Sequence, residues 1–399
     1  MSHVVVVGAG QAGSALVVKL RNLGFDGDIT LIGAENVPPY QRPPLSKKYL
    51  LGEMDMERLF LKPEAFYGQN GIDLRMGETV CKIETGAVTV GDQVLSCDEI
   101  ILTTGSTPRH LPAAIDGTLD GVYVVRNLAD VDAMAPEFGA GRHVLIVGGG
   151  YIGLEAAAVA ASKGLKVTLV EMAERILQRV ACAQTSDYFR DLHSAKGVRI
   201  IEGVGLDHLI GEGRVTGAKL SDGTELDIDF AIVGVGITPA TDVAEAAGVE
   251  IENGIRTDAQ GRTSVAGIWA AGDCASFPYR GGRIRLESVP NAIDQAELVA
   301  ENIMGAGKDY VAKPWFWSDQ FDVKLQIAGL NTGFDDVIAR NGDKDGMVSF
   351  WYYRGDQLLA VDAMNDPRGY MIGKRIIEAG KSVPKDVVAD PAADLKRFM

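Results

Sequence analysis

A glycine-rich turn that follows an apolar run occurs twice in the chain, and this repetition constrains the fold more than any other feature. The first copy is VVVVGAGQAG, residues 4–13, and the second is VLIVGGGYIG, residues 144–153. Each apolar run is typical of a strand buried in a parallel sheet, and a helical pattern follows each set of glycines. The two copies predict two βαβ units of one design, and therefore an internal duplication of a nucleotide-binding domain.

The second copy meets every condition for a dinucleotide site. Its glycines let the backbone approach a pyrophosphate, which then lies at a helix N-terminus where N–H groups favour negative charge. Glu171 ends the next strand, LKVTLVE. A carboxylate there accepts hydrogen bonds from the adenosine ribose and repels a 2′-phosphate, which favours NADH over NADPH. Arg175 and Arg179 lie close by in the sequence and leave NADPH open.

The first copy departs from this pattern in the position of its acid. Its second strand, DITLIG, ends at Gly33, and Glu35 arrives two residues later. We expect Glu35 to contact a ribose, with a place in a surface loop as the alternative. Two nucleotide sites in one chain suggest a hydride donor and a hydride acceptor, and a nicotinamide donates hydride whereas a flavin accepts it.

Composition narrows the class of protein. The 399 residues carry a formal net charge of −15, which argues against a general nucleic-acid role because phosphate backbones need a basic surface. The cysteines are isolated, so we expect no disulfide framework, zinc site or redox dithiol, and they suit a reducing cytosol. We find no leader-like or membrane-spanning apolar run and expect a cytoplasmic protein. The cysteines are Cys81, Cys97, Cys182 and Cys274.

The remaining segments complete a predicted α/β architecture. DEIILTTGSTPRHLP, FAIVGVGITPAT and IWAAGDCA each read as a strand that runs into a turn. From Pro314 the pattern changes to an α+β module. FDVKLQI alternates, so Phe321, Val323, Leu325 and Ile327 should share one face; a hairpin follows around Gly355, then a helix in PRGYMIGKRIIEAG. Residues 385–399 are expected to be loosely held.

The order of these motifs resembles the FAD-dependent pyridine-nucleotide reductases, which share the two-dinucleotide fold of glutathione reductase. The resemblance rests on GAGQAG, TTGSTPR, GGGYIGLE, GVGITP and AAGDC, and spans nearly the whole chain. It implies a discontinuous FAD-binding domain at 1–112 and 242–314, an NAD-binding domain at 113–241 and a C-terminal α+β domain at 315–399.

Three further segments give a finer match. Disulfide reductases of this superfamily carry a cysteine pair near residues 40–50, where this chain has YQRPPLSKKYL. With ESVPNAIDQA and PWFWSDQ, this segment is similar to the ferredoxin and rubredoxin reductases of bacterial oxygenase systems, of the putidaredoxin reductase type. The C-terminal domain makes the dimer in thiol reductases, but the cysteine-based reason is missing here, so a monomer or weak homodimer is expected.

The resemblance also implies site residues. Lys47 would lie near the flavin N5, with Glu155 as its ion-pair partner and as the residue that positions the nicotinamide. The residues implied for FAD are Gly8, Gly10, Ala12, Gly13, Glu35, Arg42, Lys47, Val80, Thr104, Gly105, Arg126, Gly272, Asp273, Val289 and Trp317. The residues implied for NADH are Gly148, Gly150, Ile152, Gly153, Glu171, Gly236 and Ile237.

Several of these residues have a simpler alternative. Lys47 could be a surface lysine, Glu155 a first-turn helix acid, and Asp273 the N-cap of a helix. Trp317 could be core packing. Small ferredoxins of this kind are usually acidic, which predicts a basic docking patch in YRGGRIR, although the next helix carries acids of the wrong sign. The patch residues are Arg280, Arg283 and Arg285; the acids are Asp294, Glu297 and Glu301.

The expected function is an NADH-dependent reductase that passes electrons through FAD to a [2Fe–2S] ferredoxin serving a P-450 or Rieske oxygenase. The alternatives are reduction of another acceptor (monodehydroascorbate, rubredoxin or a nitrite system) and a redox-sensing flavoprotein of the apoptosis-inducing-factor type. An NADH oxidase or peroxidase would need a catalytic cysteine near RPPLSK, and the nearest one along the chain is Cys81.

Overall fold

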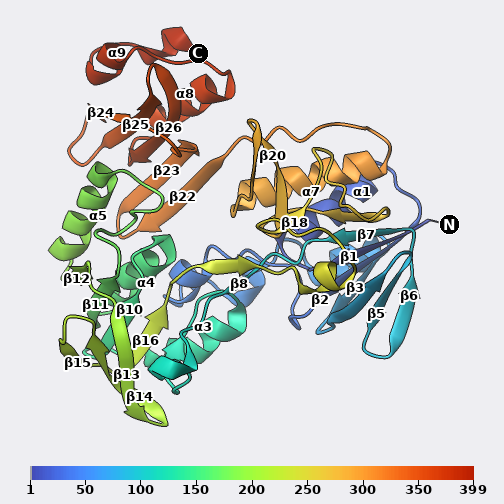
Figure 1. The fold of residues 1–399 in the computed structure, drawn as a ribbon, viewed down its shortest axis with the longest axis horizontal. Coiled ribbons are helices and arrows are strands. Elements are labelled where there is room, and N and C mark those ends of the chain that lie inside the picture. The colour runs from blue at the N-terminus through green and yellow to red at the C-terminus, as the bar shows by residue number, and fades with distance from the viewer. Residues whose placement is uncertain (1) are drawn as a thin grey trace. The chain divides into compact units, whose positions relative to one another are not determined.

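The computed structural model describes residues 2–399, which divide into two compact units (Figure 1). Unit 1 contains the residues up to 42, 55–107 and 237–314, and unit 2 contains residues 43–54, 108–236 and 315–399. The predicted division into three domains remains a prediction. The chain passes between the units several times, and the short segment 43–54 belongs to unit 2 although its neighbours in sequence belong to unit 1.

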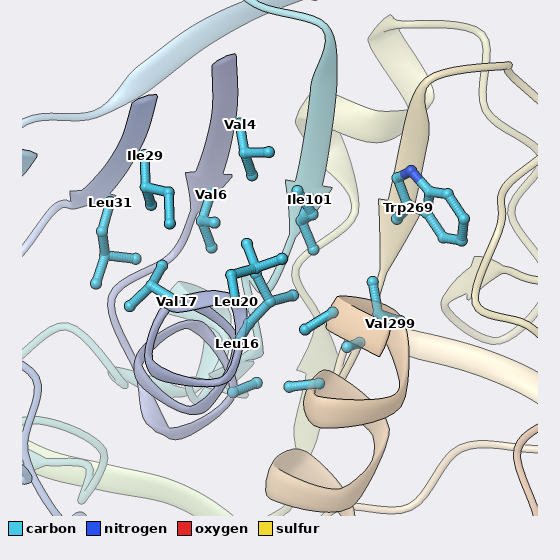
Figure 2. Packing of buried hydrophobic residues seen from close by; sticks show 14 of the residues in the cluster. Val4, Val6, Leu16, Val17, Leu20, Ile29, Leu31, Ile101, Trp269 and Val299 are labelled. Atoms are coloured by element: carbon cyan, nitrogen blue, oxygen red, sulfur yellow. The ribbon is translucent and has the colours of Figure 1, made fainter. Parts of the chain in front are cut away.

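Unit 1 is built on a five-stranded parallel sheet whose central strand leads into the first glycine turn. The strand order is β19 (Ile268–Ala270), β7 (Glu99–Leu102), β1 (His3–Val7), β2 (Asp28–Gly33) and β3 (Ile72–Met76). Helices α1 (Gln11–Asn22) and α7 (Val289–Ile303) pack together beside this sheet. Figure 2 shows Leu16, Val17 and Leu20 of α1 pointing at the apolar side chains of the strands.

Unit 2 repeats this design around the second glycine turn. Its parallel sheet has the order β12 (Arg199–Glu202), β11 (Lys166–Glu171), β10 (His143–Val147), β16 (Phe230–Val233) and β9 (Val122–Tyr123). Helices α4 (Tyr151–Ser162) and α5 (Ala183–Ala195) follow β10 and β11. The two sheets differ at one edge, because β9 precedes the glycine-turn strand in the chain whereas β19 comes after all the others in its sheet.

Each unit also carries a three-stranded antiparallel sheet, inserted between the third and fourth parallel strands when these are counted along the chain from the glycine-turn strand. In unit 1 this is β4 (Val80–Glu84), β5 (Ala87–Val90) and β6 (Gln93–Ser96), and in unit 2 it is β13 (Leu206–Glu212), β14 (Arg214–Leu220) and β15 (Glu225–Asp227). The shared insertion supports a duplication. The remaining α-helices and strands before residue 314 are α2 (Glu64–Gln69), β8 (Ser106–Pro108), α3 (Leu128–Met134), β17 (Ile237–Pro239), α6 (Asp242–Ala246), β18 (Ile255–Arg256), β20 (Ala275–Tyr279) and β21 (Gly282–Ile284).

The C-terminal part of unit 2 is a five-stranded antiparallel sheet with helices. Its order is β22 (Trp315–Gln320), β23 (Val323–Gly329), β26 (Gln357–Met364), β25 (Val348–Arg354) and β24 (Asp336–Asn341), followed by α8 (Pro367–Glu378) and α9 (Lys385–Ala389). The predicted hairpin around Gly355 is present, since Arg354 pairs with Gln357.

Two expectations for this region were wrong. Phe321 does not lie on the strand face with Val323, because it sits at the turn between β22 and β23 with φ +54°. Residues 385–399 are not loosely held, since Val388 and Leu395 are buried. Arg340 donates hydrogen bonds to several main-chain carbonyls of this segment, including those of Asp390 and Ala393. The Arg340 guanidinium, with its several N–H donors, thus fixes a segment that was expected to be loosely held.

Candidate functional site

The first glycine turn, in unit 1, admits no side chain at two of its glycines. A Cβ on Gly8, where φ is +112°, would lie 2.3 Å from the carbonyl oxygen of Thr103, and one on Gly13 would lie 2.1 Å from that of Gly8. A Cβ on Gly10 meets no atom within 4 Å. Gly10 is also the N-cap of α1, and no side chain caps that end. The turn therefore leaves open space in front of unpaired helix N–H groups, which suits a pyrophosphate.

Residues from three other segments of unit 1 surround this turn. The Thr103 hydroxyl donates to the carbonyl oxygen of Gly8 over 2.7 Å, and that of Thr104 donates to Ala240 over 2.6 Å. Ser106 donates to the Asp273 carboxylate over 3.2 Å. The N-cap alternative for Asp273 is wrong, because the chain enters strand β20 there instead of a helix. Gly105 and Gly272 both have positive φ, which explains their residue type.

Glu35 is held by side chains of the following loop. Its carboxylate accepts a hydrogen bond of 2.5 Å from the Tyr40 hydroxyl and forms an ion pair of 2.5 Å with Arg42. The Arg42 guanidinium also lies over the Tyr40 ring, 5.1 Å from its centroid. Two of the residues predicted for FAD thus contact each other, and Tyr40, which sequence reasoning missed, joins them. The sequence did point to Tyr40, since it is the first residue of YQRPPLSK, a segment on which the family resemblance rests.

The other residues predicted for FAD are distributed over both units. In unit 1, Ala12 is buried in α1, Val80 is buried at the start of β4, and Val289 is the half-buried first residue of α7. Lys47, Arg126 and Trp317 belong to unit 2. Their contact with a flavin remains a prediction.

The second glycine turn, in unit 2, has the same geometry. A Cβ on Gly148, at φ +107°, would lie 2.5 Å from the carbonyl oxygen of Gly234, and one on Gly153 would lie 2.1 Å from that of Gly148. A Cβ on Gly150 again meets nothing within 4 Å, and Gly150 is the N-cap of α4 with no side-chain cap. Ile152, in the first turn of α4, is 45% exposed.

Glu171 is fixed by the backbone of this second turn. One carboxylate oxygen accepts a hydrogen bond of 2.7 Å from the Gly149 N–H, and the other accepts one of 2.8 Å from the Ala173 N–H. Each oxygen keeps a free lone pair for a ribose hydroxyl. Arg175 is turned inward, since it donates to the carbonyl oxygens of Ala181 and Cys182 and to Ser186. Gly236 has φ +108°, and Ile237 begins β17.

The predicted ion pair between Lys47 and Glu155 is present in unit 2. The Lys47 ammonium lies 2.8 Å from the Glu155 carboxylate, which is 4% exposed. The surface-lysine alternative for Lys47 does not hold, because its side chain is 16% exposed. Ser46 donates to one oxygen of Glu155 and Ser318 to the other, each over 2.8 Å. Neither serine was predicted, although both lie in segments that carried the resemblance.

Two of the three arginines of the predicted docking patch have structural partners inside unit 1. Arg283 donates two hydrogen bonds of 2.6 Å to the carbonyl oxygens of Thr257 and Ser276, and burial lowers its pKa. Arg285 forms an ion pair of 2.6 Å with Glu287 and is 10% exposed. Arg280 is exposed. The docking patch remains a prediction that, of these three residues, rests mainly on Arg280.

Within residues 2–399, every helix is too short or too polar to span a lipid bilayer.

Comparison with known proteins places these features in a family. Residues 2–296 match the model of the pyridine nucleotide-disulphide oxidoreductases, and residues 315–399 match that of the reductase C-terminal domain. The chain is 41% identical to a ferredoxin–NAD(P)+ reductase of a Sphingomonas species, over 99% of this chain and 97% of that one. It is 36% identical to the ferredoxin–NAD+ reductase component of the anthranilate 1,2-dioxygenase system of Burkholderia cepacia, over 99% and 98% of the two chains.

A solved structure agrees with the fold described above. The reductase of the covalent putidaredoxin reductase–putidaredoxin complex superposes with a TM-score of 0.96 at 36% identity, covering 100% of this chain and 98% of that one. The predicted α/β class, with two Rossmann-like domains and a C-terminal α+β domain, is confirmed, as is the resemblance to the FAD-dependent reductases.

Proposed function

Because the chain belongs to the pyridine nucleotide-disulphide oxidoreductase family, we propose that it is an NADH-dependent flavoprotein reductase that delivers electrons to a [2Fe–2S] ferredoxin of an oxygenase system. The observation that carries this proposal is the pair of open glycine turns, one in each unit, in a chain similar to ferredoxin reductases along its whole length. Each turn offers a pyrophosphate the same clearance and the same uncapped helix end.

The residues of unit 1 fit FAD. The pyrophosphate would lie at Gly10, and the Asp273 carboxylate, held by Ser106, would bind the ribityl hydroxyls. Glu35, oriented by Tyr40 and Arg42, would accept from the adenosine ribose. When bound, the flavin would supply chemistry that no side chain can, because it accepts two electrons as one hydride and releases them one at a time. The residues of the chain contribute binding, orientation and electrostatics.

The residues of unit 2 fit NADH better than NADPH. Glu171 is pinned at the turn by the Gly149 N–H, where its charge would oppose a 2′-phosphate. Arg175, the nearer candidate for binding that phosphate, is committed to two backbone carbonyls and Ser186. A guanidinium that leaves such partners loses several hydrogen bonds, so recruiting it for a phosphate is costly. Arg179 is exposed and is the remaining alternative.

Lys47 and Glu155 are proposed as the residues that orient the nicotinamide. The Glu155 carboxylate has an opposite charge and two hydroxyl donors around it, so its position is fixed before a ligand arrives. Lys47 also donates to the carbonyl oxygen of Pro43 over 3.3 Å, which limits where its ammonium can move. A fixed cation beside the acceptor would stabilise the negative charge that hydride transfer brings.

The test is electron transfer from NADH to cytochrome c by the purified yellow protein, with and without a [2Fe–2S] ferredoxin. We expect a low rate without ferredoxin and a steep, saturable rise with it, and a KM for NADPH well above that for NADH. Lys47→Ala should slow flavin reduction by NADH and leave the FAD content unchanged. A rate indifferent to ferredoxin would contradict the proposal and move the function to another acceptor, such as monodehydroascorbate or rubredoxin.

A further inference from the structure

A chain of buried polar side chains leads away from Glu155 into the interior of unit 2. Ser318 donates to a Glu155 oxygen over 2.8 Å, and the Gln320 amide nitrogen donates to the Ser318 hydroxyl over 3.1 Å. The Gln320 amide oxygen lies 2.8 Å from Nε2 of His193. Ser318, Gln320 and His193 are each at most 1% exposed. Such a connected network is expensive to bury unless every member is satisfied, so its presence beside a proposed site calls for a role.

The donor and acceptor of each hydrogen bond in this network follow from the Glu155 carboxylate at one end of it. The Glu155 carboxylate, which is paired with Lys47, can only accept hydrogen bonds. The Ser318 hydroxyl must therefore donate its one proton to this carboxylate. Ser318 then accepts from the Gln320 NH₂, which leaves the Gln320 oxygen facing His193. Nε2 of His193 must therefore carry the proton. Burial lowers the pKa of His193 to about 4, in agreement with a neutral ring, and the hydrogen bond to the Gln320 oxygen assigns its one proton to Nε2.

The elements that carry these residues make the arrangement rigid. Ser318 and Gln320 alternate with Trp317 along β22, so the two polar side chains share the buried face of the strand. His193 lies near the end of α5, with the Phe321 ring against it edge-on at 5.0 Å. Nδ1 of His193, the nitrogen without a proton in this assignment, has no hydrogen-bond partner within residues 2–399, so the network holds the ring through Nε2 alone and leaves one acceptor unsatisfied.

We propose that Ser318, Gln320 and His193 form a one-way hydrogen-bond relay that positions the Glu155 carboxylate against Lys47. The three are positioning residues, since none of them contacts Lys47 through a hydrogen bond of its own. The inference rests on the proposed role of Glu155 in orienting the nicotinamide. Losing the Ser318 proton would free one carboxylate oxygen to rotate, and the ammonium of Lys47 would follow it.

The first experiment reads the relay without measuring activity. The protein, labelled with ¹⁵N at its histidines, is studied by NMR as the FAD-bound form near pH 7. We expect His193 to be the neutral tautomer protonated at Nε2. In Ser318→Ala the link to the carboxylate is cut, so the shifts of His193 should change. A neutral ring protonated at Nδ1 in the wild type, or shifts that Ser318→Ala leaves unaltered, would overturn the proposal.

The second experiment links the relay to hydride transfer. Stopped-flow reduction by NADH is compared for Ser318→Ala, Ser318→Thr and Gln320→Glu. We expect Ser318→Ala to slow reduction about tenfold, as the loss of a hydrogen bond to a charged group implies. Ser318→Thr should retain most of the rate. Gln320→Glu should be slow because two acceptor-only carboxylates would compete for one hydroxyl proton.

Matched controls separate this role from simple loss of stability. Ser349→Ala removes another buried serine of the same sheet, and Gln357→Glu places the same new charge at an exposed position. In both control variants, NADH should reduce the flavin at the wild-type rate. If Glu155→Gln slows reduction but Ser318→Ala and Gln320→Glu do not, the relay is refuted and the proposed function stands. If Glu155→Gln also has no effect, the proposed role of Glu155 fails with it.

Discussion

The two glycine turns meet the same steric demands and differ in how each holds its acid. A Cβ on Gly13 or on Gly153 would lie 2.1 Å from a carbonyl oxygen of its own turn. Glu171, however, accepts from backbone N–H groups beside its turn, whereas Glu35 accepts from Tyr40 and Arg42 in a loop. A duplicated fold has thus kept the backbone of the turn and changed the groups that hold the acid. Under the proposed function, the shared backbone would receive a pyrophosphate in both units, and the divergent surroundings of the acid would distinguish FAD from NADH.

The largest expected effect is on nucleotide binding, and it comes from substituting Gly10 and Gly150, the middle glycines of the two turns. Gly10→Ala and Gly150→Ala place a methyl group where nothing lies within 4 Å, so the fold should remain intact while the pyrophosphate space is filled. We expect Gly10→Ala to lose most of its FAD on purification. Gly150→Ala should keep FAD but show an apparent affinity for NADH reduced by about 10–100-fold, measured by stopped-flow titration.

Gly68→Ala is the matched control. A Cβ on Gly68 would also meet no atom within 4 Å, but Gly68 lies in α2, away from both turns in sequence. This variant should retain FAD and NADH affinity. Loss of FAD from Gly150→Ala, or normal FAD content in Gly10→Ala, would show that the turns are not assigned to separate ligands.

A smaller effect is expected from the two acids. Glu171→Ala should raise the KM for NADH about tenfold and reduce the ratio of the KM for NADPH to that for NADH. The substitution removes both carboxylate oxygens that would accept from the ribose, and the charge that would repel a 2′-phosphate. Glu35→Ala should leave the KM for NADH unchanged and weaken FAD retention. Steady-state kinetics with both nucleotides, together with the FAD absorbance per protein, check the pair. Equal effects of the two variants on the KM for NADH would contradict the division of roles.

The smallest effect concerns pH and a buried acid of unit 2. Burial raises the pKa of Asp362 to about 6, although hydrogen bonds from Tyr352 and Thr185 favour its charged form. The folded state then holds a proton that the unfolded chain releases near pH 4, so stability falls as pH rises from about 4 to about 6. Relative to Asp362→Asn, the wild type should lose about 2–4 °C in Tm over that range.

Differential scanning calorimetry at several pH values measures this difference. The lowered pKa of His193 acts in the opposite sense, because a buried neutral histidine costs stability as pH falls, but it is common to both proteins and cancels in the difference. A Tm difference that does not vary with pH would mean that Asp362 does not titrate in this range.

Local patterns predicted the backbone of both turns correctly. The spacing of Gly8 and Gly13 after an apolar run is a property of adjacent residues, and so is the place of Glu171 at a strand end. The pairing of Lys47 with Glu155 lies beyond local reasoning, because the two residues are far apart in sequence, and it came from the family resemblance.

The missed features depend on tertiary packing. Ser318 and Gln320 read as ordinary polar residues of a strand, and only the packing of β22 in unit 2 brings them to Glu155 and His193. Phe321 adopts φ +54° at a tight hairpin, a conformation that its residue type argues against. Arg283 appeared to be part of a surface basic run, yet it satisfies buried carbonyl groups.

The position of β19 has a consequence for how the chain folds during synthesis. All five strands of the unit 2 parallel sheet lie between residues 122 and 233, whereas the unit 1 sheet, which begins at residue 3, lacks its edge strand until residues 268–270 emerge from the ribosome. Until then β7 presents an open edge, a template for unwanted pairing. Domains normally fold in the order of their synthesis. Of the two parallel sheets, the one that starts first is therefore finished second, and the segment inserted between its strands can complete its own parallel sheet before β19 is synthesised.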